Sequence, residues 1–110
     1  MAYIPERGDA VWLVFDPQAG HEQAGRRPAL VISPRAYNAK AGLCLACTVT
    51  SQVKGYPFET ALPGGLPIAG VVLADQIMSL DWRARKAEYI CTLPAETTSD
   101  VIEKISLLIA

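Results

Sequence analysis

Residues 8–33 read GDAVWLVFDPQAGHEQAGRRPALVIS, and this stretch decides most of the fold. Its two apolar runs, residues 10–15 and 28–33, are rich in Val, Leu and other residues that favour strands. The loop between them holds glycines, a glutamate and two arginines. A group of charged side chains of this kind is unusual between two hydrophobic strands. Functional residues concentrate in loops that a rigid scaffold positions. The stretch therefore predicts two strands joined by a loop that carries a site.

Further strand-like runs follow after residue 33. Glycine-containing turn signals at residues 54–55 and 63–65 separate them. Ser33 and Pro34 predict a short helical turn through Asn38, with Ser33 as its N-cap and Pro34 at its first position. The remaining predicted strands are residues 43–50, 57–62, 70–75 and 77–85, with a short one near 88–92.

The C-terminal segment is the one long helix that the sequence predicts, because its apolar residues recur at helical spacing. Thr97 or Thr98 can cap its start, and Asp100 falls in the first turn, where the helix dipole favours an anion. Many short strands and one closing helix predict a mainly β (α+β) protein built on a small, strongly bent antiparallel sheet or barrel. The apolar stripe consists of Val101, Ile102, Ile105, Leu108 and Ile109.

The composition describes one globular domain, residues 1–110. Hydrophobic residues make up 51% and charged residues 19%, whereas disorder requires low hydrophobicity and high net charge. No apolar run approaches the roughly 20 residues of a membrane span, and the N-terminus lacks the basic-then-apolar order of a secretory signal. We therefore expect a cytoplasmic protein with no membrane contact.

The charge of the chain is small but unevenly distributed. The net charge of −1 gives no global signal for nucleic acid. Residues 1–86 carry nine Lys and Arg against seven Asp and Glu, giving +2, whereas residues 87–110 carry one Lys and four acids, giving −3. The sequence is thus compatible with a local basic groove in the N-terminal part, and equally with charges scattered over a solvated surface.

The three cysteines point to neither a disulfide framework nor a metal site. An odd number of cysteines without a secretory signal argues against disulfides. Cys44 and Cys47 fall in one predicted strand, where residues three apart point to opposite faces, and Cys91 stands alone. The chain has only one histidine. We expect buried thiols that behave as small hydrophobic groups, with no bound metal or other cofactor.

Several blocks, in order and spanning about residues 3–109, resemble the MazF/PemK family. One is Gly-x-Glu-Gln-x-Gly-x-Arg-Pro at residues 20–28, which follows a Gly-Asp, a strand and an Asp-Pro. Others are Lys-Gly-Tyr-Pro-Phe-Glu at 54–59, Asp-Gln at 75–76 and Trp-Arg-x-Arg at 82–85. The resemblance implies an SH3-like β-barrel of the CcdB/PemK type with short helices packed on it.

The same resemblance implies a function. It describes the toxin of a type II toxin–antitoxin module, a sequence-specific endoribonuclease that cuts single-stranded RNA, above all mRNA, without a metal. The products would carry 2′,3′-cyclic phosphate and 5′-hydroxyl ends. Family toxins are homodimers, and a cognate MazE/PemI-like antitoxin lays an extended acidic segment along them. Two alternatives stay open, because function lives in the site and not in the fold: a non-enzymatic, gyrase-binding CcdB-like toxin, and a relative that only binds RNA.

Metal-free RNA cleavage needs groups that remove the 2′-hydroxyl proton, protonate the leaving oxygen and stabilise phosphoryl charge. A single histidine, His21, excludes a two-histidine mechanism within one chain, and the acids are dispersed rather than clustered for a metal. A guanidinium, a hydroxyl and one carboxylate remain. Arg27 is the first catalytic candidate because its planar fork can bind two phosphate oxygens and Pro28 restricts its backbone. The resemblance implies that this arginine is catalytic.

The resemblance places the catalytic hydroxyl on Thr50, at the end of a predicted strand. Alignment through residues 54–59 selects Thr50 over Thr48, a choice that alternation cannot make because both share one face. Glu22 is the third catalytic candidate, either as the general base or as the group that orients Arg27. A carboxylate beside two arginines is a poor base near neutral pH, which favours the supporting role.

The predicted RNA-binding residues surround this site. Arg83 and Arg85, two apart in the predicted strand 77–85, would present both charges on one face as a phosphate-tracking surface. Trp82 would then face the core. Aromatic side chains such as Tyr56 can stack on unpaired bases. The full predicted set is Gln23, Arg26, Lys54, Tyr56, Gln76, Arg83 and Arg85.

Overall fold

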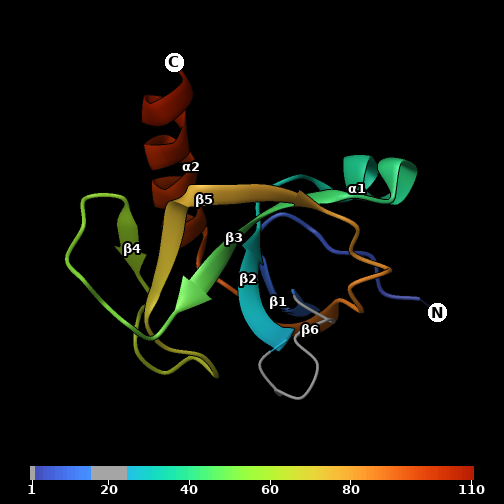
Figure 1. Cartoon of the computed structure of the whole chain (residues 1–110), viewed down its shortest axis with the longest axis horizontal. Helices are drawn as coiled ribbons and strands as arrows, with labels where there is room; N and C mark the ends of the chain where they lie inside the picture. The colour runs from blue at the N-terminus through green and yellow to red at the C-terminus, as the bar shows by residue number, and fades with distance from the viewer. Residues whose placement is uncertain (1, 16–24) are drawn as a thin grey trace.

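The computed structural model describes residues 2–15 and 25–110 of the chain (Figure 1). Within them six strands and two helices follow one another. The longer helix stands against one side of the bent sheet and the shorter helix lies at its other side (Figure 1). The elements are β1 (Asp9–Val14), β2 (Arg26–Val31), α1 (Arg35–Ala41), β3 (Cys44–Thr50), β4 (Glu59–Ala61), β5 (Val71–Leu80), β6 (Glu88–Thr92) and α2 (Ala95–Ile109).

All six strands form one antiparallel sheet in the order β4-β5-β3-β2-β1-β6. β2 lies between β1 and β3, so Leu30 is opposite Ala10 on one side and Cys47 on the other. The two apolar runs of residues 8–33 are thus neighbours near the middle of the sheet. The prediction of a mainly β protein with a C-terminal helix is confirmed.

Side-chain alternation divides the buried residues between the two faces of the sheet. Ala10 and Leu30 belong to a cluster that packs against α2 through Val101, and all three are fully buried. Val11, the next residue of β1, belongs to a second cluster on the other face that includes Trp82. The Trp82 side chain is 4% exposed and its indole N–H donates to the Asn38 carbonyl at 3.0 Å. Trp82 is therefore a core residue, as predicted.

β5 bends sharply partway along its length (Figure 1). Cys47 of β3 is opposite Ile77 of β5, whereas Val49 is opposite Val72, so residues 73–76 of β5 lie against one residue of β3. Extra residues on one strand of a pair bend it. The part of β5 before the bend pairs with β4, and the part after it pairs with the start of β3. The prediction of a separate strand at 70–75 is wrong, because both halves belong to one bent strand.

After Leu80 the chain makes a tight turn instead of continuing as a strand to residue 85. Asp81 causes this, because its Oδ1 accepts the backbone N–H groups of Arg83 (3.1 Å) and Ala84 (2.9 Å). A side chain that bonds its own neighbouring backbone competes with the strand ladder. The Ala87 N–H then donates to the Trp82 carbonyl at 2.9 Å and closes the turn. The predicted strand 77–85 is therefore wrong beyond Leu80.

Helix α1 begins later and ends later than predicted. Pro34, not Ser33, occupies the N-cap position, and the helix continues to Ala41. The Ser33 hydroxyl donates to Asn38 Oδ1 at 2.5 Å instead of capping the helix. The fully buried Asn38 side chain also donates to the Pro5 carbonyl at 2.8 Å. The prediction that Ser33 caps the helix is therefore wrong, because its hydroxyl is bonded to the buried Asn38 side chain.

Helix α2 begins at Ala95, earlier than predicted, with Pro94 at the N-cap position. Thr97 and Thr98 are therefore buried helical residues and not caps. Asp100 lies beyond the first turn and bonds to β4 instead, as described below. The apolar stripe is confirmed only in part: Val101 and Ile105 are buried, whereas Leu108 is 45% and Ile109 78% exposed.

The thiols of Cys44 and Cys47 are buried in the two separate clusters, on opposite faces of the sheet. Burial raises the pKa of Cys44 to about 11, and burial together with the nearby Asp75 carboxylate raises the pKa of Cys47 to about 12. The prediction of buried thiols within the hydrophobic core is confirmed for these two. Among the described residues, no three His, Cys, Asp or Glu side chains gather as a metal site requires. No helix in that part of the chain is long and apolar enough to cross a membrane.

Candidate active site

A hollow of about 470 Å³ opens where the start of β2 lies beside the end of β3. These strands are antiparallel with Ala29 opposite Thr48, so Arg27 and Thr50 come to the same end of the sheet. Both line the hollow. Strand pairing thus brings together two candidate residues that lie far apart in the sequence. The other lining residues are Trp12, Pro28, Val49, Ser51, Gln52, Ile68 and Ala69.

A second, smaller hollow of about 180 Å³ continues from the first, because Thr50 and Gln52 line both. We call the two together the Thr50 groove. The second hollow contains three of the predicted RNA-binding residues: Lys54, Tyr56 and Gln76. Its lining is completed by Glu59, Leu73 and Asp75.

Thr50 is the last residue of β3, opposite Val71 of β5. Its hydroxyl oxygen accepts a hydrogen bond from the Gln52 N–H at 3.1 Å. This bond uses a lone pair and leaves the hydroxyl proton to be donated to another acceptor. A substrate phosphate in the groove could receive it, so Thr50 can act as a fixed donor.

Gly70 brings the neighbouring chain unusually close to Thr50. Gly70 has a φ of +117°, and a Cβ built there would lie 2.0 Å from the Thr50 carbonyl oxygen and 2.9 Å from Ser51 Cα. No side chain fits into that space. The end of β3 can approach β5 only because residue 70 is glycine, and this contact fixes the backbone of Thr50.

Thr48 does not line either hollow. It is 9% exposed, and its hydroxyl lies 3.4 Å from Gln76 Oε1, at the long limit of a hydrogen bond. Alternation put Thr48 and Thr50 on one face, but residues 73–76 of β5 bulge against β3 between them. The structure therefore places Thr50, and not Thr48, in the groove with Arg27.

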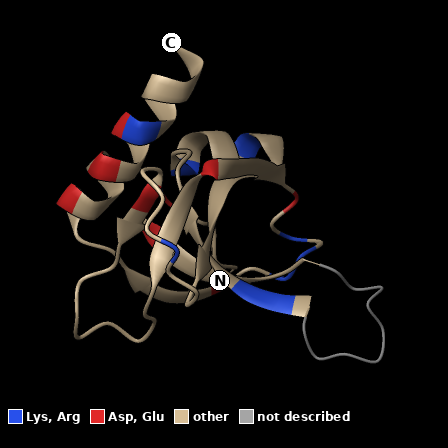
Figure 2. Cartoon of the chain, turned by 60° about the vertical axis from the view of Figure 1, so that its left-hand side comes forward, with Lys and Arg blue, Asp and Glu red and all other residues tan. Residues whose placement is uncertain are grey.

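Arg27 is exposed at the start of β2, opposite Leu13 of β1. Among the described lining residues of the groove, Arg27 and Lys54 are the cations and Glu59 and Asp75 the acids. The groove as a whole is thus balanced in charge rather than strongly basic. Figure 2 shows the basic start of β2 at one end of the molecule and the acidic positions of α2 at the other. The charge asymmetry along the sequence is only partly an asymmetry in space, because Glu88 of the acidic C-terminal part pairs with Arg26 at the start of β2.

Arg26 lies beside the groove with its charge already paired. Its Cζ atom is 4.9 Å from the centroid of the Trp12 ring, and its Nη2 lies 2.5 Å from Glu88 Oε1. The Arg26 side chain is 50% exposed and the Glu88 side chain 66% exposed, so the pair remains accessible to a competing anion. Arg26 does not line the first hollow, but it contacts Trp12, which does.

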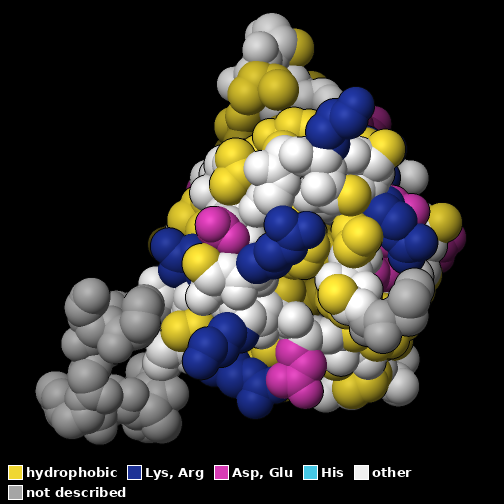
Figure 3. Space-filling view, turned by 90° about the vertical axis from the view of Figure 1, so that its right-hand side faces the viewer, with side chains coloured by type: hydrophobic (Ala, Val, Ile, Leu, Met, Phe, Trp, Pro, Cys, Tyr) yellow, Lys and Arg dark blue, Asp and Glu magenta, His cyan; other side chains and the backbone are white. Residues whose placement is uncertain are grey.

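Arg83 and Arg85 lie outside the Thr50 groove, and the prediction that they share a strand face is wrong. Both belong to the turn after β5. The Arg85 guanidinium donates to the carbonyls of Val14 and Phe15, each at 2.9 Å, so it holds the end of β1. Arg83 stacks on Trp82, with its Cζ 4.6 Å from the ring centroid. Figure 3 shows the face that carries α1: its basic side chains are scattered, with acidic ones among them.

Three residues of the predicted loop lie outside the described residues: His21, Glu22 and Gln23. Two residues that sequence reasoning missed do line or shape the groove. Trp12 alternates along β1 with the buried Val11 and Leu13, so its large side chain lies on the other face, and this is the only sign of its role in the sequence. Gly70 carries no local signal, since its role depends on a contact with another strand.

The sheet and helices described above agree with the fold of known proteins. The family model for the PemK-like, MazF-like toxin of type II toxin–antitoxin systems matches residues 6–109. The endoribonuclease toxin MazF of Escherichia coli strain K12 is 50% identical over 107 residues, which cover 97% of this chain and 96% of that protein. The crystal structure of MazF from Deinococcus radiodurans matches with a TM-score of 0.89 and 56% identity, covering 98% of both chains.

A MazE–MazF complex from Deinococcus radiodurans matches equally well, with a TM-score of 0.89 and 50% identity over 98% of this chain and 97% of that one. Fold and sequence together define a toxin of a type II toxin–antitoxin system. The chain belongs to the PemK-like, MazF-like family. The predicted family and the predicted fold type are both confirmed.

Proposed function

We propose that this endoribonuclease toxin cuts single-stranded RNA, mRNA above all, at specific sequences and without a metal. The neighbouring 2′-hydroxyl loses its proton and its oxygen attacks the phosphorus, the bond to the 5′-oxygen breaks, and that oxygen takes up a proton, so that the products carry 2′,3′-cyclic phosphate and 5′-hydroxyl ends. The observation that supports this is the presence of Arg27 and Thr50 in one hollow at the end of β3. A guanidinium and a hydroxyl donor on one side of a phosphate can stabilise the negative charge that builds on the phosphoryl oxygens in this reaction.

Arg27 holds the scissile phosphate in this mechanism. Its guanidinium stays charged at all working pH values and offers two parallel N–H donors to two phosphoryl oxygens. Thr50 donates its hydroxyl proton to a phosphoryl oxygen while the Gln52 N–H holds its oxygen in place. As negative charge builds on the phosphoryl oxygens, both interactions strengthen, which lowers the barrier.

Glu22 completes the proposed catalytic set. We assign it to the site from the family motif, in which it stands three residues before Gly25. It serves either as the base for the 2′-hydroxyl proton or as the carboxylate that holds Arg27. Gln23 of the same motif is proposed to contact the RNA.

Substrate binding on either side of the scissile phosphate falls to the rest of the Thr50 groove. Tyr56 is 59% exposed and offers a face for base stacking. Lys54 supplies a charge for a neighbouring phosphate, and Gln76 supplies an amide that can read a base edge. Arg26 adds attraction beside the groove. Arg83 and Arg85 contribute nothing inside the groove.

We propose two protein partners. One is a cognate antitoxin of the MazE/PemI type, which is supported by the likeness to the toxin of a MazE–MazF complex. The other is a second copy of the chain in a homodimer. The exposed apolar end of α2 supports this second partner, because Leu107 and Ile109 are 73% and 78% exposed.

The first test is cleavage of a long single-stranded RNA by the purified protein in EDTA, with the cut ends mapped. We expect cuts at one short recurring sequence, with cyclic phosphate ends. Arg27→Ala and Thr50→Ala should each lower kcat/KM by about 100- to 1,000-fold, the usual effect of losing one donor to a developing oxyanion. Thr50→Ser keeps the hydroxyl and should retain most activity.

Lys40→Ala, an exposed change on α1 outside the groove, serves as the matched control. An Arg27→Ala protein that cleaves like the wild type would contradict the mechanism. Cleavage that appears only when a divalent metal is added would contradict the metal-free chemistry.

A further inference from the structure

Residues 51–58 carry Lys54 and Tyr56 into the Thr50 groove without a strand or helix of their own. Backbone pairing therefore cannot fix their position as it fixes Thr50. The two ends of the segment are held, at one end by the bond from the Gln52 N–H to the Thr50 hydroxyl and at the other by the bonds from the Ala74 N–H to the Phe58 carbonyl and from the Glu59 N–H to the Tyr56 carbonyl. Some other group must hold the middle of the segment against the groove.

The Glu59 side chain provides this support. Its Oε2 accepts the Lys54 N–H at 3.1 Å, and its Oε1 accepts the Gly55 N–H at 2.9 Å. One carboxylate thus binds two successive amides of the segment that carries the groove residues. Bonds to an ionised acceptor are stronger than those to a neutral one. Gly55 has a φ of +80°, which lets the chain turn so that both amides point at Glu59.

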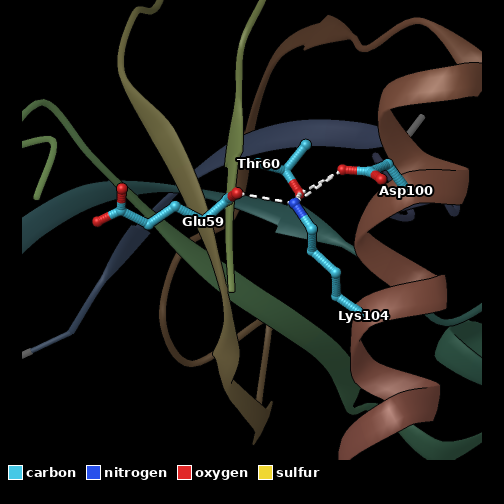
Figure 4. Close-up of polar contacts among 4 residues, drawn as sticks. All are labelled: Glu59, Thr60, Asp100 and Lys104. Carbon is cyan, nitrogen blue, oxygen red and sulfur yellow. Dashed lines mark hydrogen bonds and ion pairs between the residues drawn. The ribbon is translucent and has the colours of Figure 1, made fainter. Parts of the chain in front are cut away.

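Helix α2 holds Glu59 from the opposite side (Figure 4). The Lys104 ammonium donates to the Glu59 carbonyl at 2.8 Å and to the Thr60 hydroxyl oxygen at 3.0 Å. The Thr60 hydroxyl donates to Asp100 Oδ2 at 2.8 Å, and Lys104 lies 3.1 Å from the same carboxylate oxygen. Thr60 is only 6% exposed, so this contact is the point at which β4 is fastened to the helix.

We propose that Glu59 is a positioning residue for RNA binding, which sets the place of Lys54 and Tyr56, and that Lys104 supports it from α2. This inference rests on the proposed function, in which these two groove residues contact the substrate. Glu59 itself makes its bonds to backbone amides. Its role is therefore to shape the binding surface, and not to take part in the reaction.

The proposal separates binding from chemistry. The backbone of Thr50 is held by its pairing with Val71 and by the close approach of Gly70, and Arg27 is held by β2, and none of these contacts involves the Glu59 carboxylate. Loss of the Glu59 carboxylate should let Lys54 and Tyr56 move while the catalytic pair stays in place. An interaction of this kind changes KM and leaves kcat nearly constant.

The experiment measures kcat and KM on a short RNA that contains one cut site. We expect Glu59→Ala to raise KM about tenfold with kcat nearly unchanged, since two charge-assisted bonds are lost. Glu59→Gln keeps one acceptor oxygen and should give an intermediate KM. Lys104→Met should raise KM by a smaller factor, and Lys104→Arg should restore part of it. Glu103→Ala, an exposed acid on the same helix, is the control.

RNA affinity is measured in parallel by fluorescence anisotropy in the Thr50→Ala background, where the RNA remains uncut. Glu59→Ala should weaken that affinity by the same factor as it raises KM. A lower kcat at unchanged KM, together with a lower melting temperature, would show a purely structural role and overturn the inference. Unchanged KM and affinity would overturn it as well.

The same measurements distinguish this inference from the proposed function. If the wild type binds RNA in a Glu59-dependent way but does not cut it in EDTA, the proposed function fails and the positioning role stands. If the wild type cuts RNA while Glu59→Ala matches it in KM, the positioning role fails and the proposed function stands. Failure of the wild type both to bind and to cut would overturn both.

Discussion

Thr50 owes its place in the groove to a glycine that precedes the neighbouring strand. The carbonyl of Thr50 occupies the space where a Cβ of residue 70 would be, and Gly70 adopts a backbone conformation that L-residues rarely take. Gly70 itself takes no part in the proposed reaction. It decides where the hydroxyl is held relative to Arg27, and small displacements of a reacting group have large effects on rate.

Gly70→Ala should therefore damage catalysis and stability together. The new Cβ would lie 2.0 Å from a backbone oxygen, so β3 must move away. We expect kcat/KM to fall by about 100-fold, as for a displaced reacting group, and the free energy of unfolding to fall by about 2 kcal/mol from backbone strain. Gly64→Ala is the matched control, because its Cβ would meet nothing within 4 Å.

Cleavage kinetics and urea unfolding of both variants check this prediction. Wild-type kcat/KM in Gly70→Ala would show that the end of β3 can shift without effect. Damage of equal size in Gly64→Ala would mean that any added methyl in this region is harmful, and the close contact with Thr50 would then not be the cause.

At the scale of elements, α2 does more than cover the sheet. Its buried side chains Val101 and Ile105 pack on the core, as an amphipathic helix should. Its polar residues Asp100 and Lys104, four apart on the helix, both form hydrogen bonds with the Thr60 hydroxyl of β4 and pair with each other. We call these three residues the clasp. β4 is only three residues long and lies at the edge of the sheet, so the clasp supplies support that strand pairing alone does not.

This clasp should depend on pH. The Thr60 hydroxyl and the Lys104 ammonium, by their hydrogen bonds to Asp100, hold the pKa of its carboxyl below the ordinary 3.8. A carboxyl with a lowered pKa in the folded state stabilises the fold fully above its unfolded value and loses this as pH falls through the folded pKa. Its contribution is thus present above pH 3.8 and lost in more acidic solution.

We expect the wild type to be more stable than Asp100→Asn by about 0.5 kcal/mol at pH 6, a common size for a partly exposed helix pair. The difference should disappear as the pH is lowered toward 2. Urea unfolding at several pH values measures it, with Glu103→Gln as a control on the same helix. A difference that stays constant between pH 6 and pH 2 would mean that ionisation of Asp100 does not stabilise the clasp.

At the scale of the whole molecule, one thin sheet has a core on each face and keeps part of its apolar surface uncovered. Leu107 and Ile109, at the end of α2, are the most exposed large hydrophobic side chains among the described residues. Met78 of β5 and Leu45 of β3 add smaller exposed areas, at 37% and 36%. A group of exposed apolar side chains on a small protein is typical of an interface.

The proposed homodimer can be tested at this end of α2. Leu107→Glu and Ile109→Glu together should convert the dimer to a monomer at micromolar concentration, because burying two carboxylates in an apolar interface is costly. Light scattering after size exclusion measures the mass directly. Glu96→Lys, at the exposed start of the same helix, should leave the mass unchanged. A wild-type mass of one chain, or a dimer that survives both changes, would contradict the placement of the interface.

Much of the fold was predictable because its signals are local. Apolar runs of strand-favouring residues marked β1, β2 and β3, and the helical spacing of Val101 and Ile105 marked α2. The errors arose where side chains bond to backbone. Asp81 ends β5 by accepting two amides, and this cannot be read from hydrophobicity. Arg85 was therefore placed on a strand face, although it holds the end of β1.

The sequence by itself determined the family and the types of the main elements, and it predicted Arg27 and Thr50 as candidate site residues, because each depends on residue identity and short-range order. Only the tertiary structure decided the rest. It showed that Lys54, Tyr56 and Gln76 share a groove with Thr50, that Gly70 must lack a side chain, and that Glu59 supports the binding segment. Contacts between segments far apart in the chain depend on strand pairing and on the bend in β5, which no local pattern encodes.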